Sequence, residues 1–379
     1  MNTQSRIDFL DTLRAFIIFL VIAMHAALAY VSGWPDWVHN PHTDPLFGLI
    51  YYFAESGVLM PILFFIAGYF TLPSLLKRSP GEFLRDKLAR LGIPYVIGVV
   101  ILSPVMVGLV YYANGGTLPL MQALFQFVPP HFVGQYHFWF LGVLLLYFAL
   151  VILVSVRLPE ALSFARSLPN RPSARFWAVG IGITWVACFA VNLVSKYSVW
   201  TSLYVLQFQS VKFPLYNAFF LLGMVAYQKG WFQGGYQPRL FPWAGIYLVT
   251  LVFMLGMVSV NGGEPVTVLG KALMNLTACV ETLAALMTYL ALFQSLQKHV
   301  RPFWMKLSSL SYSAYLIHLT VLFIVLSFTR DLAVPLFFKY LLQVMVTELI
   351  VWGSAYGIQK VAIWRSPGAL RTKISESSD

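Results

Sequence analysis

The stretch DTLRAFIIFLVIAMHAALAY, residues 11–30, decides the fold class of this chain. It has the length of an apolar helix that crosses about 30 Å of hydrocarbon at a rise of 1.5 Å per residue. It also contains Arg14 and His25, which are eleven residues apart. Eleven residues make about three helical turns, so the two side chains share one face, about 16 Å apart along the axis. An ionisable group inside a span costs about 2.5–3.5 kcal/mol and normally faces a cavity or a partner. The pair therefore marks a candidate functional site.

Similar apolar stretches recur along the whole chain. Of its 379 residues, 59% are hydrophobic and only 10% are charged, and the mean hydropathy is +0.74. The aromatic residues are too continuous with aliphatic ones for the alternating pattern of an outer-membrane barrel. We therefore predict an all-α polytopic transmembrane bundle of about ten spans: 12–32, 47–72, 93–113, 137–156, 176–196, 213–229, 240–260, 271–296, 309–329 and 333–357.

The positions of the charged residues predict the topology and argue against nucleic acid as a partner. The net charge is +11, but nearly all Lys and Arg residues precede the first span or follow an even-numbered one. By the positive-inside rule, both termini are then cytoplasmic, in a multi-pass protein of the cell (inner or plasma) membrane. Five Lys and Arg residues lie on the other side: Lys196, Lys212, Lys271, Arg330 and Lys339.

The chain is predicted to form a single transmembrane domain, residues 1–360, followed by a short cytoplasmic tail, residues 361–379. Its two cysteines, Cys188 and Cys279, lie within spans and are predicted to be small core residues. We predict no metal site, because no cluster of His, Cys and carboxylate residues has ligand-like spacing. Oligomeric state cannot be read from the sequence.

The outward loops 33–46 and 114–136 contain no Lys or Arg but are rich in aromatic residues and histidine. Such loops can bind a sugar by stacking and hydrogen bonding, and an interfacial aromatic belt is the alternative. The residues concerned are Trp34, Trp37, His39, His42, His131 and Tyr136.

Six short stretches follow one another along the chain: RIDFLDTLRA with its R-x10-H pair, FFIAGYF (64–70), KLARLGIPY (87–95), HFWFLGVLLLYF (137–148), FFLLGMVAY (219–227) and SYSAYLIH (311–318). Taken in this order, they resemble acyltransferase family 3, a family of multipass membrane proteins. The resemblance covers about residues 6–320, and the ordered set is more specific than any single stretch. Two residues depart from the family pattern: Lys87 replaces the first arginine of its RxxR motif, and Ala67 replaces the serine of its FFxSGF motif.

The resemblance implies a membrane O-acyltransferase. Such an enzyme moves an acetyl or similar short acyl group from cytoplasmic acyl-coenzyme A, here most simply acetyl-CoA, to a hydroxyl of an extracytoplasmic carbohydrate or lipid-linked sugar. It also implies that His25 is catalytic and that Arg14 belongs to the same site. A neutral imidazole can take the proton of an attacking hydroxyl, a contribution of about 10²–10⁴ in rate. An acyl-histidine intermediate is an open alternative.

Acyl-coenzyme A carries several phosphate charges, so its binding region should be basic and cytoplasmic. Arg85, Lys87 and Arg90, just before the third predicted span, are the candidates. The alternative is that these cations only enforce topology.

Other intramembrane polar residues are Glu55, Glu281, Glu348 and His318, with His137 at the entrance of the fourth span. One of the glutamates or His318 can support His25 through its second ring nitrogen, and the alternative for a glutamate is a buried hydrogen-bonded carboxyl. The sequence does not choose among them.

A different class of function is a transporter or exporter of a saccharide or other solute. Ten spans with scattered glutamates and histidines suit it. The basic segment before Pro94, predicted to be a loop, favours the acyltransferase, because a transporter needs no phosphate-binding entrance there.

Overall fold

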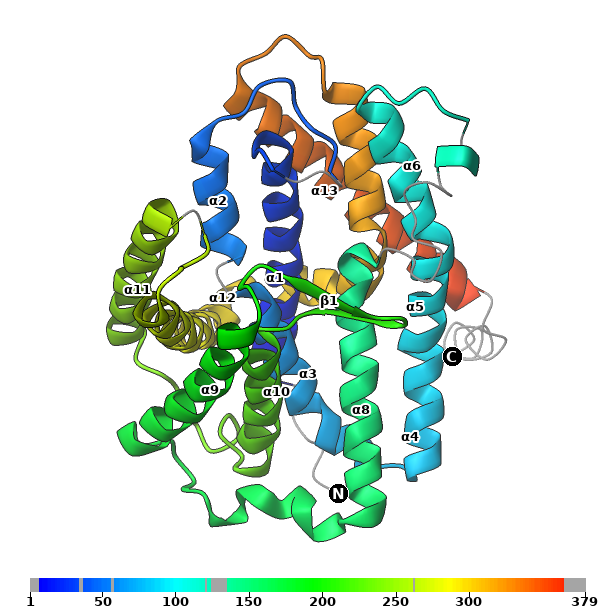
Figure 1. Cartoon of the computed structure of the whole chain (residues 1–379). Coiled ribbons are helices and arrows are strands. Elements are labelled where there is room, and N and C mark those ends of the chain that lie inside the picture. The colour runs from blue at the N-terminus through cyan, green and yellow to red at the C-terminus, as the bar shows by residue number, and fades with distance from the viewer. Residues whose placement is uncertain are drawn as a thin grey trace.

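The protein is an all-α helical bundle, with one short β-hairpin in the part of the chain that the structure describes (Figure 1). The computed structural model describes residues 7–33, 37–55, 58–119, 121–123, 135–261 and 263–364. Within these ranges, the side chains of residues 54–55, 261, 298–302 and 361–364 are not described.

The elements follow one another in the order below. Short helices labelled η are 3-10 or π segments. The α-helices are α1 (Asp8–Ala27), α2 (Pro45–Glu55), α3 (Leu59–Leu75), α4 (Pro80–Lys87), α5 (Ile93–Ile97), α6 (Ser103–Ala113), α8 (Trp139–Arg157), α9 (Ala174–Val194), α10 (Phe213–Gln228), α11 (Leu240–Asn261), α12 (Val268–Thr329) and α13 (Leu336–Trp364). The remaining elements are η1 (Leu28–Tyr30), η2 (Leu88–Gly92), η3 (Gly98–Leu102), η4 (Tyr136–Phe138), η5 (Pro159–Ser167), β1 (Trp200–Leu203) and β2 (Leu206–Gln209).

The fold class predicted from the sequence is confirmed. Among the described residues, eight helical segments are long and apolar enough to cross a membrane. Of the other two predicted spans, 47–72 contains α2 and the 17-residue α3, and 213–229 corresponds to α10, with 16 residues. The protein is a polytopic membrane protein.

Three of the predicted spans differ from the structure in their connections. The predicted span 47–72 is two helices, α2 and α3. Pro61 lies in the first turn of α3, where a missing N–H costs little because that turn has no acceptor for it. The predicted spans 271–296 and 309–329 are parts of one continuous helix, α12. Figure 1 shows its first part, in yellow, crossing the view and its second part, in orange, rising through the bundle.

The basic segment before Pro94 is helical, whereas the sequence analysis treated it as a loop. The helix starts at Pro80, and α4, η2, α5, η3 and α6 follow without a break to Ala113. A capping box starts it: the Ser79 hydroxyl accepts from the N–H of Glu82, and the Glu82 carboxylate accepts from the N–H of Ser79. Two π-helical segments, η2 and η3, interrupt the α-helical hydrogen bonding.

Helices α3 and α10 approach each other closely through two glycines. A Cβ atom on Gly68 would lie 2.0 Å from the carbonyl oxygen of Phe220, and one on Gly223 would lie 2.1 Å from that of Phe65. Small residues at such a crossing let two membrane helices pack backbone to backbone. The stretches FFIAGYF and FFLLGMVAY therefore form a packing contact.

A β-hairpin between α9 and α10 is not predicted by the sequence analysis. Strands β1 and β2 pair antiparallel, with Trp200 opposite Gln209. Its turn contains Tyr204 at a φ of +49°. The hydroxyl of Tyr95, on α5, donates to the carbonyl of Val205 and ties the hairpin to the α4–α6 helix.

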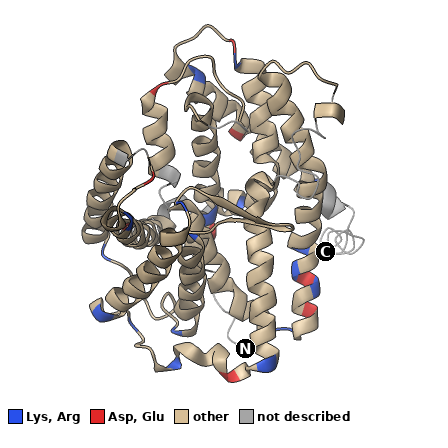
Figure 2. Ribbon diagram, viewed as in Figure 1, with Lys and Arg blue, Asp and Glu red and all other residues tan. Residues whose placement is uncertain are grey.

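The charged residues are unevenly distributed over the bundle. Figure 2 shows Lys and Arg gathered at its lower end and along the lower part of the α4–α6 helix. The upper end carries few of them. This distribution matches the asymmetry on which the predicted cytoplasmic side rests.

Candidate functional site

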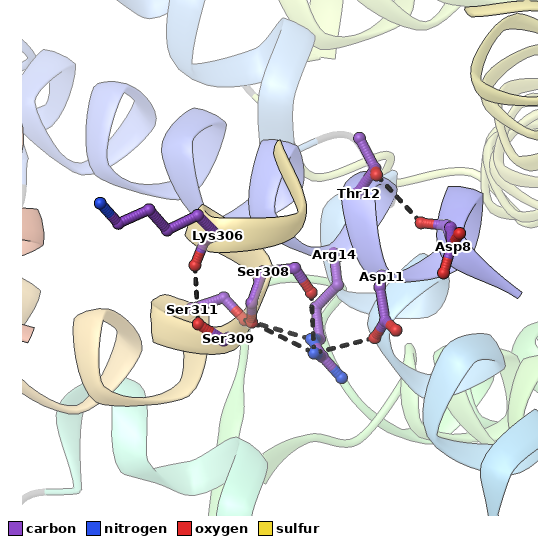
Figure 3. A network of polar contacts seen from close by, with 8 residues as sticks. All are labelled: Asp8, Asp11, Thr12, Arg14, Lys306, Ser308, Ser309 and Ser311. Carbon is purple, nitrogen blue, oxygen red and sulfur yellow. Dashed lines mark hydrogen bonds and ion pairs between the residues drawn. The ribbon is translucent and has the colours of Figure 1, made fainter. Parts of the chain in front are cut away.

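Arg14 is held between its own helix and the second part of α12 (Figure 3). Its Nη2 lies 3.0 Å from Oδ1 of Asp11, one turn earlier on α1. Its Nε donates to the Ser311 hydroxyl at 3.1 Å. The same Nη2 donates to the hydroxyl and carbonyl oxygens of Ser308 at 3.2 and 3.3 Å. The guanidinium fork thus joins α1 to α12, and the Arg14 side chain stays 36% exposed.

His25 contacts the same helix about three turns further on. Its Nδ1 lies 3.3 Å from Nε2 of His318, and the two rings stack with centroids 5.3 Å apart. The Trp37 ring stacks nearby, at 5.5 Å and 27°. His25 is partly accessible, while its chain neighbours Met24 and Ala26 are only 8% and 0% exposed. The common face predicted for Arg14 and His25 is the face that α1 presents to α12, and the two helices run in the same direction there.

A third histidine completes the group, which we call the histidine cluster: His25, His137 and His318. The His137 ring lies 4.5 Å from the His318 ring. Its Nε2 is 3.2 Å from the carbonyl oxygen of Leu316, and the Tyr315 hydroxyl donates to the His137 carbonyl. The start of α8 is therefore fixed against the second part of α12.

The hydrogen bonds assign the protons within the cluster. Nδ1 of His318 lies 2.6 Å from the carbonyl oxygen of Tyr315. A carbonyl only accepts, so Nδ1 of His318 carries the hydrogen, and Nε2 of the neutral ring is an acceptor. The His25 Nδ1–H then donates to it. This leaves the lone pair on Nε2 of His25, the nitrogen available for chemistry.

His318 is thus the residue that contacts the second ring nitrogen of His25. Glu348 accepts a hydrogen bond from Trp352 on its own helix at 2.6 Å. Glu281 is fully buried on the first part of α12, and the Glu55 side chain lies outside those described.

From the sequence, His318 was one of several candidates for this contact with His25, and His137 was named without a role beside His25. The sequence did contain a signal for the histidine cluster, because three of the seven histidines of the chain lie in apolar stretches.

The predicted donor-binding residues lie in three different settings. Arg90 is 71% exposed and pairs with Asp86 at 2.9 Å, and Asp86 also pairs with Arg78 at 2.8 Å. Lys87 is not directed into solvent, because its Nζ lies over the rings of Phe83 and Phe148, at 5.0 and 4.5 Å from their centroids. Arg85 is exposed on α4.

One contact links this region to Arg14. The hydroxyl of Tyr312 donates to the carbonyl of Arg90. Tyr312 follows Ser311, the residue that accepts a hydrogen bond from Arg14. Arg90 and Arg14 are therefore brought to neighbouring positions along α12.

Part of the outward aromatic loops can be placed. Trp37 and Tyr136 both contact the Phe323 ring, at 4.8 and 5.7 Å between centroids. The backbone N–H groups of His39 and His42 donate to the side chains of Asn114 and Asn40. Trp34 and His131 lie outside the described residues. Within the described part of the chain, no group of three or more His, Cys, Asp or Glu residues is arranged to hold a metal ion.

The family model of the acyltransferase domain matches residues 7–356 of this chain. No curated protein and no solved structure matches the chain. Because the family model spans nearly the whole chain and includes Arg14, His25 and His318, the protein belongs to acyltransferase family 3 and is a membrane acyltransferase.

Proposed function

We propose that the protein transfers a short acyl group, acetyl in the simplest case, from cytoplasmic acyl-coenzyme A to a hydroxyl of an extracytoplasmic carbohydrate or lipid-linked sugar. The observation that carries the proposal is His25. It is a partly accessible histidine within a membrane helix, and its Nδ1 hydrogen bonds to His318. The family membership supports acyl transfer in general.

His25 acts as the general base in this proposal. Its Nε2 takes the proton of the acceptor hydroxyl as the oxygen attacks the thioester carbonyl carbon. The carbon–sulfur bond then breaks, and the departing thiolate takes the proton from the imidazolium. His318 is a positioning residue, because its Nε2 accepts from His25 Nδ1–H in both the neutral and the charged state of His25.

Arg14 and Arg90 serve the donor. Phosphate groups prefer arginine, which offers paired N–H donors. Arg90 is 71% exposed, and its ion pair with the partly buried Asp86 is weak enough to be exchanged for a phosphate. Tyr312 brings Arg90 next to the Arg14 contacts, so the donor can run along α12 from Arg90 past Arg14 towards His25.

Lys87 has a smaller role in the proposal than the sequence analysis gave it. Its ammonium group rests on two aromatic rings, which stabilises the contact between α4 and α8. Arg85 remains a candidate for a long-range electrostatic contribution at the cytoplasmic side. The proposed location is the cell membrane, with the basic end of the bundle facing the cytoplasm.

The test uses membranes containing the protein and acyl-coenzyme A labelled in the acyl group. Binding of the donor and appearance of label in the glycan and glycolipid fraction are measured for wild type, His25→Ala and Arg90→Ala. We expect His25→Ala to bind the donor and to lose about 10²–10⁴-fold in transfer rate. We expect Arg90→Ala to bind the donor more weakly.

Arg239→Ala is a control for general charge loss, because Arg239 lies on the same predicted side but in the connection between α10 and α11. Normal transfer by His25→Ala would refute the assigned chemistry. Donor binding that responds equally to Arg90→Ala and Arg239→Ala would refute the proposed donor site.

A further inference from the structure

Several polar atoms next to the histidine cluster are buried without a hydrogen-bond partner among the described residues. They are Nε1 of Trp37, both side-chain polar atoms of Gln135, and Nδ1 of His137. The three residues are 6%, 0% and 5% exposed. Native proteins pair nearly all buried polar atoms, so such a group calls for a partner that the described residues do not supply.

These residues come from different parts of the chain and meet at the histidine cluster. Trp37 stacks on His25, and the His137 ring lies 4.5 Å from that of His318. Gln135 is two residues before His137. Trp37 and Tyr136 both contact Phe323, which lies beyond His318 along α12 and on the side away from Arg14. The unpartnered atoms therefore lie on the side of the cluster opposite to the proposed donor route.

The backbone between Gln135 and His137 is strained. Tyr136 has a φ of +40°, a left-handed conformation that is unfavourable for a bulky residue. This conformation sets Gln135 and His137 immediately before α8. Such strain is characteristic of segments that hold functional groups in position.

The chemistry of these atoms defines the occupant. The Trp37 N–H only donates. The Gln135 amide donates and accepts. Nε2 of His137 faces the Leu316 carbonyl and so carries the hydrogen, which makes Nδ1 an acceptor. A mixture of donors and acceptors with no cation matches hydroxyl groups, which both donate and accept, better than a carboxylate or a phosphate.

We infer that Trp37, Gln135 and His137 form the acceptor site, and that this site takes a neutral polyhydroxylated molecule, one hydroxyl of which faces Nε2 of His25. The inference rests on the proposed function, since it assigns the second substrate of the same reaction. It places the two substrates on opposite sides of the histidine cluster, with the donor from the Arg14 side and the acceptor from the Trp37 side.

The test measures binding of methyl glucoside and of glycerol to the purified full-length protein, without donor, by saturation-transfer NMR. Glucuronate is the charged comparison. Trp37→Phe keeps an aromatic ring against His25 but removes the N–H, and Gln135→Leu removes the amide. We expect wild type to bind the neutral probes in preference to glucuronate, and each variant to bind them about tenfold more weakly, the loss of about 1.4 kcal/mol.

Trp231→Phe is the matched control. The indole N–H of Trp231 is also buried without a partner among the described residues. Trp231 lies in the connection between α10 and α11, and its ring contacts Phe176, Trp177 and Tyr236. It should bind the probes as wild type does. Thermal unfolding of every variant shows whether it is folded.

The inference is wrong if wild type binds neither neutral probe, or if the folded Trp37→Phe and Gln135→Leu variants bind them as well as Trp231→Phe does. The second result would mean that only trapped water meets these atoms. Failure of the proposed function is distinguishable, because it appears as an absence of His25-dependent thioester turnover whatever the probe binding.

Discussion

Two helix pairs contain most of the stretches that resemble the acyltransferase family, and they differ in kind. Between α1 and α12 the contacts are polar: Arg14 with the serines, and His25 with His318. Between α3 and α10 the contact is made by Gly68 and Gly223 against backbone oxygens. The first pair holds chemical groups in place, and the second brings two backbones together. Changes in the first pair should therefore alter rate, and changes in the second should alter stability.

Apart from the loss of His25 itself, the largest expected effect follows from His318→Phe. Phenylalanine keeps a ring against His25 but cannot accept from its Nδ1–H, so His25 is no longer held in one tautomer. We expect kcat to fall about 100-fold with donor binding retained. Label transfer from acyl-coenzyme A and donor affinity are the measurements.

A glutamine at the same position provides the control. Its side-chain amide oxygen can reach about where Nε2 of His318 stands, so His318→Gln should recover part of the lost rate. Equal loss in both variants, with a lowered melting temperature, would assign His318 to packing only.

The next effect concerns the glycine pair. Gly223→Ala places a methyl group 2.1 Å from the carbonyl oxygen of Phe65, so α3 and α10 must separate. We expect the free energy of unfolding to fall by about 1–3 kcal/mol. Denaturation in detergent measures it.

Gly245→Ala on α11 is the matched control, because no atom lies within 4 Å of the added Cβ there. It should leave stability unchanged or raise it slightly, since alanine favours helix. A Gly223→Ala protein that is as stable as wild type but has lost transfer would break the distinction between the two pairs.

A smaller effect is expected for Arg14→Lys. The lysine keeps the charge near Asp11, but a single ammonium group cannot reach the serine oxygens in the geometry of the guanidinium fork. We expect transfer to fall about tenfold, equivalent to about 1.4 kcal/mol. Ser311→Ala, which removes one of the contacts, should act in the same direction and less strongly. Wild-type transfer by Arg14→Lys would mean that Arg14 is only a charged anchor at the end of the helix.

These pairs also show what the sequence can predict. The common face of Arg14 and His25 follows from helical periodicity, which is local, and it was predicted. The contact between His25 and His318 joins residues 293 positions apart, and no periodicity links them. The contact of α3 with α10 at Gly68 and Gly223 could not be predicted for the same reason, because a glycine in a motif does not show which backbone will approach it.

The helical structure of the basic segment before Pro94 was not predicted, although it had a local signal. A helix start is indicated by Ser79, Pro80 and Glu82. The apolar pattern that defines a span begins later, so the basic segment was taken for a loop. The continuity of α12 is different. Its two apolar parts are separated by a polar stretch that contains Pro302, which predicts a break, whereas the structure is helical there. Helix–helix packing on both sides overrides that local preference.

The smallest expected effect is a pH dependence that belongs to neither helix pair. Glu264, in the connection between α11 and α12, accepts hydrogen bonds from the N–H groups of Tyr197 and Ser198, and from the Ser198 hydroxyl. Partial burial opposes ionisation, but these hydrogen bonds and nearby Lys196 outweigh it and lower the pKa of Glu264 below its ordinary value of 4.5. The carboxylate therefore stabilises the fold at pH values above 4.5, and this contribution is lost as the pH falls through the lowered pKa.

Glu264→Gln should accordingly be less stable than wild type near neutral pH, and the two denaturation midpoints should converge as the pH falls below 4.5 and through the lowered pKa of Glu264. The effect is small because the carboxylate is largely solvated. The Glu264→Gln variant separates two causes of a pH-dependent transfer rate. A change in transfer that occurs above pH 4.5 and is the same in wild type and Glu264→Gln cannot come from loosening of this connection, and the histidine cluster between α1 and α12 is then its source. A pH-dependent change in transfer that disappears in Glu264→Gln would instead assign the pH response to the start of α12. The pH response would then no longer support the role of His25.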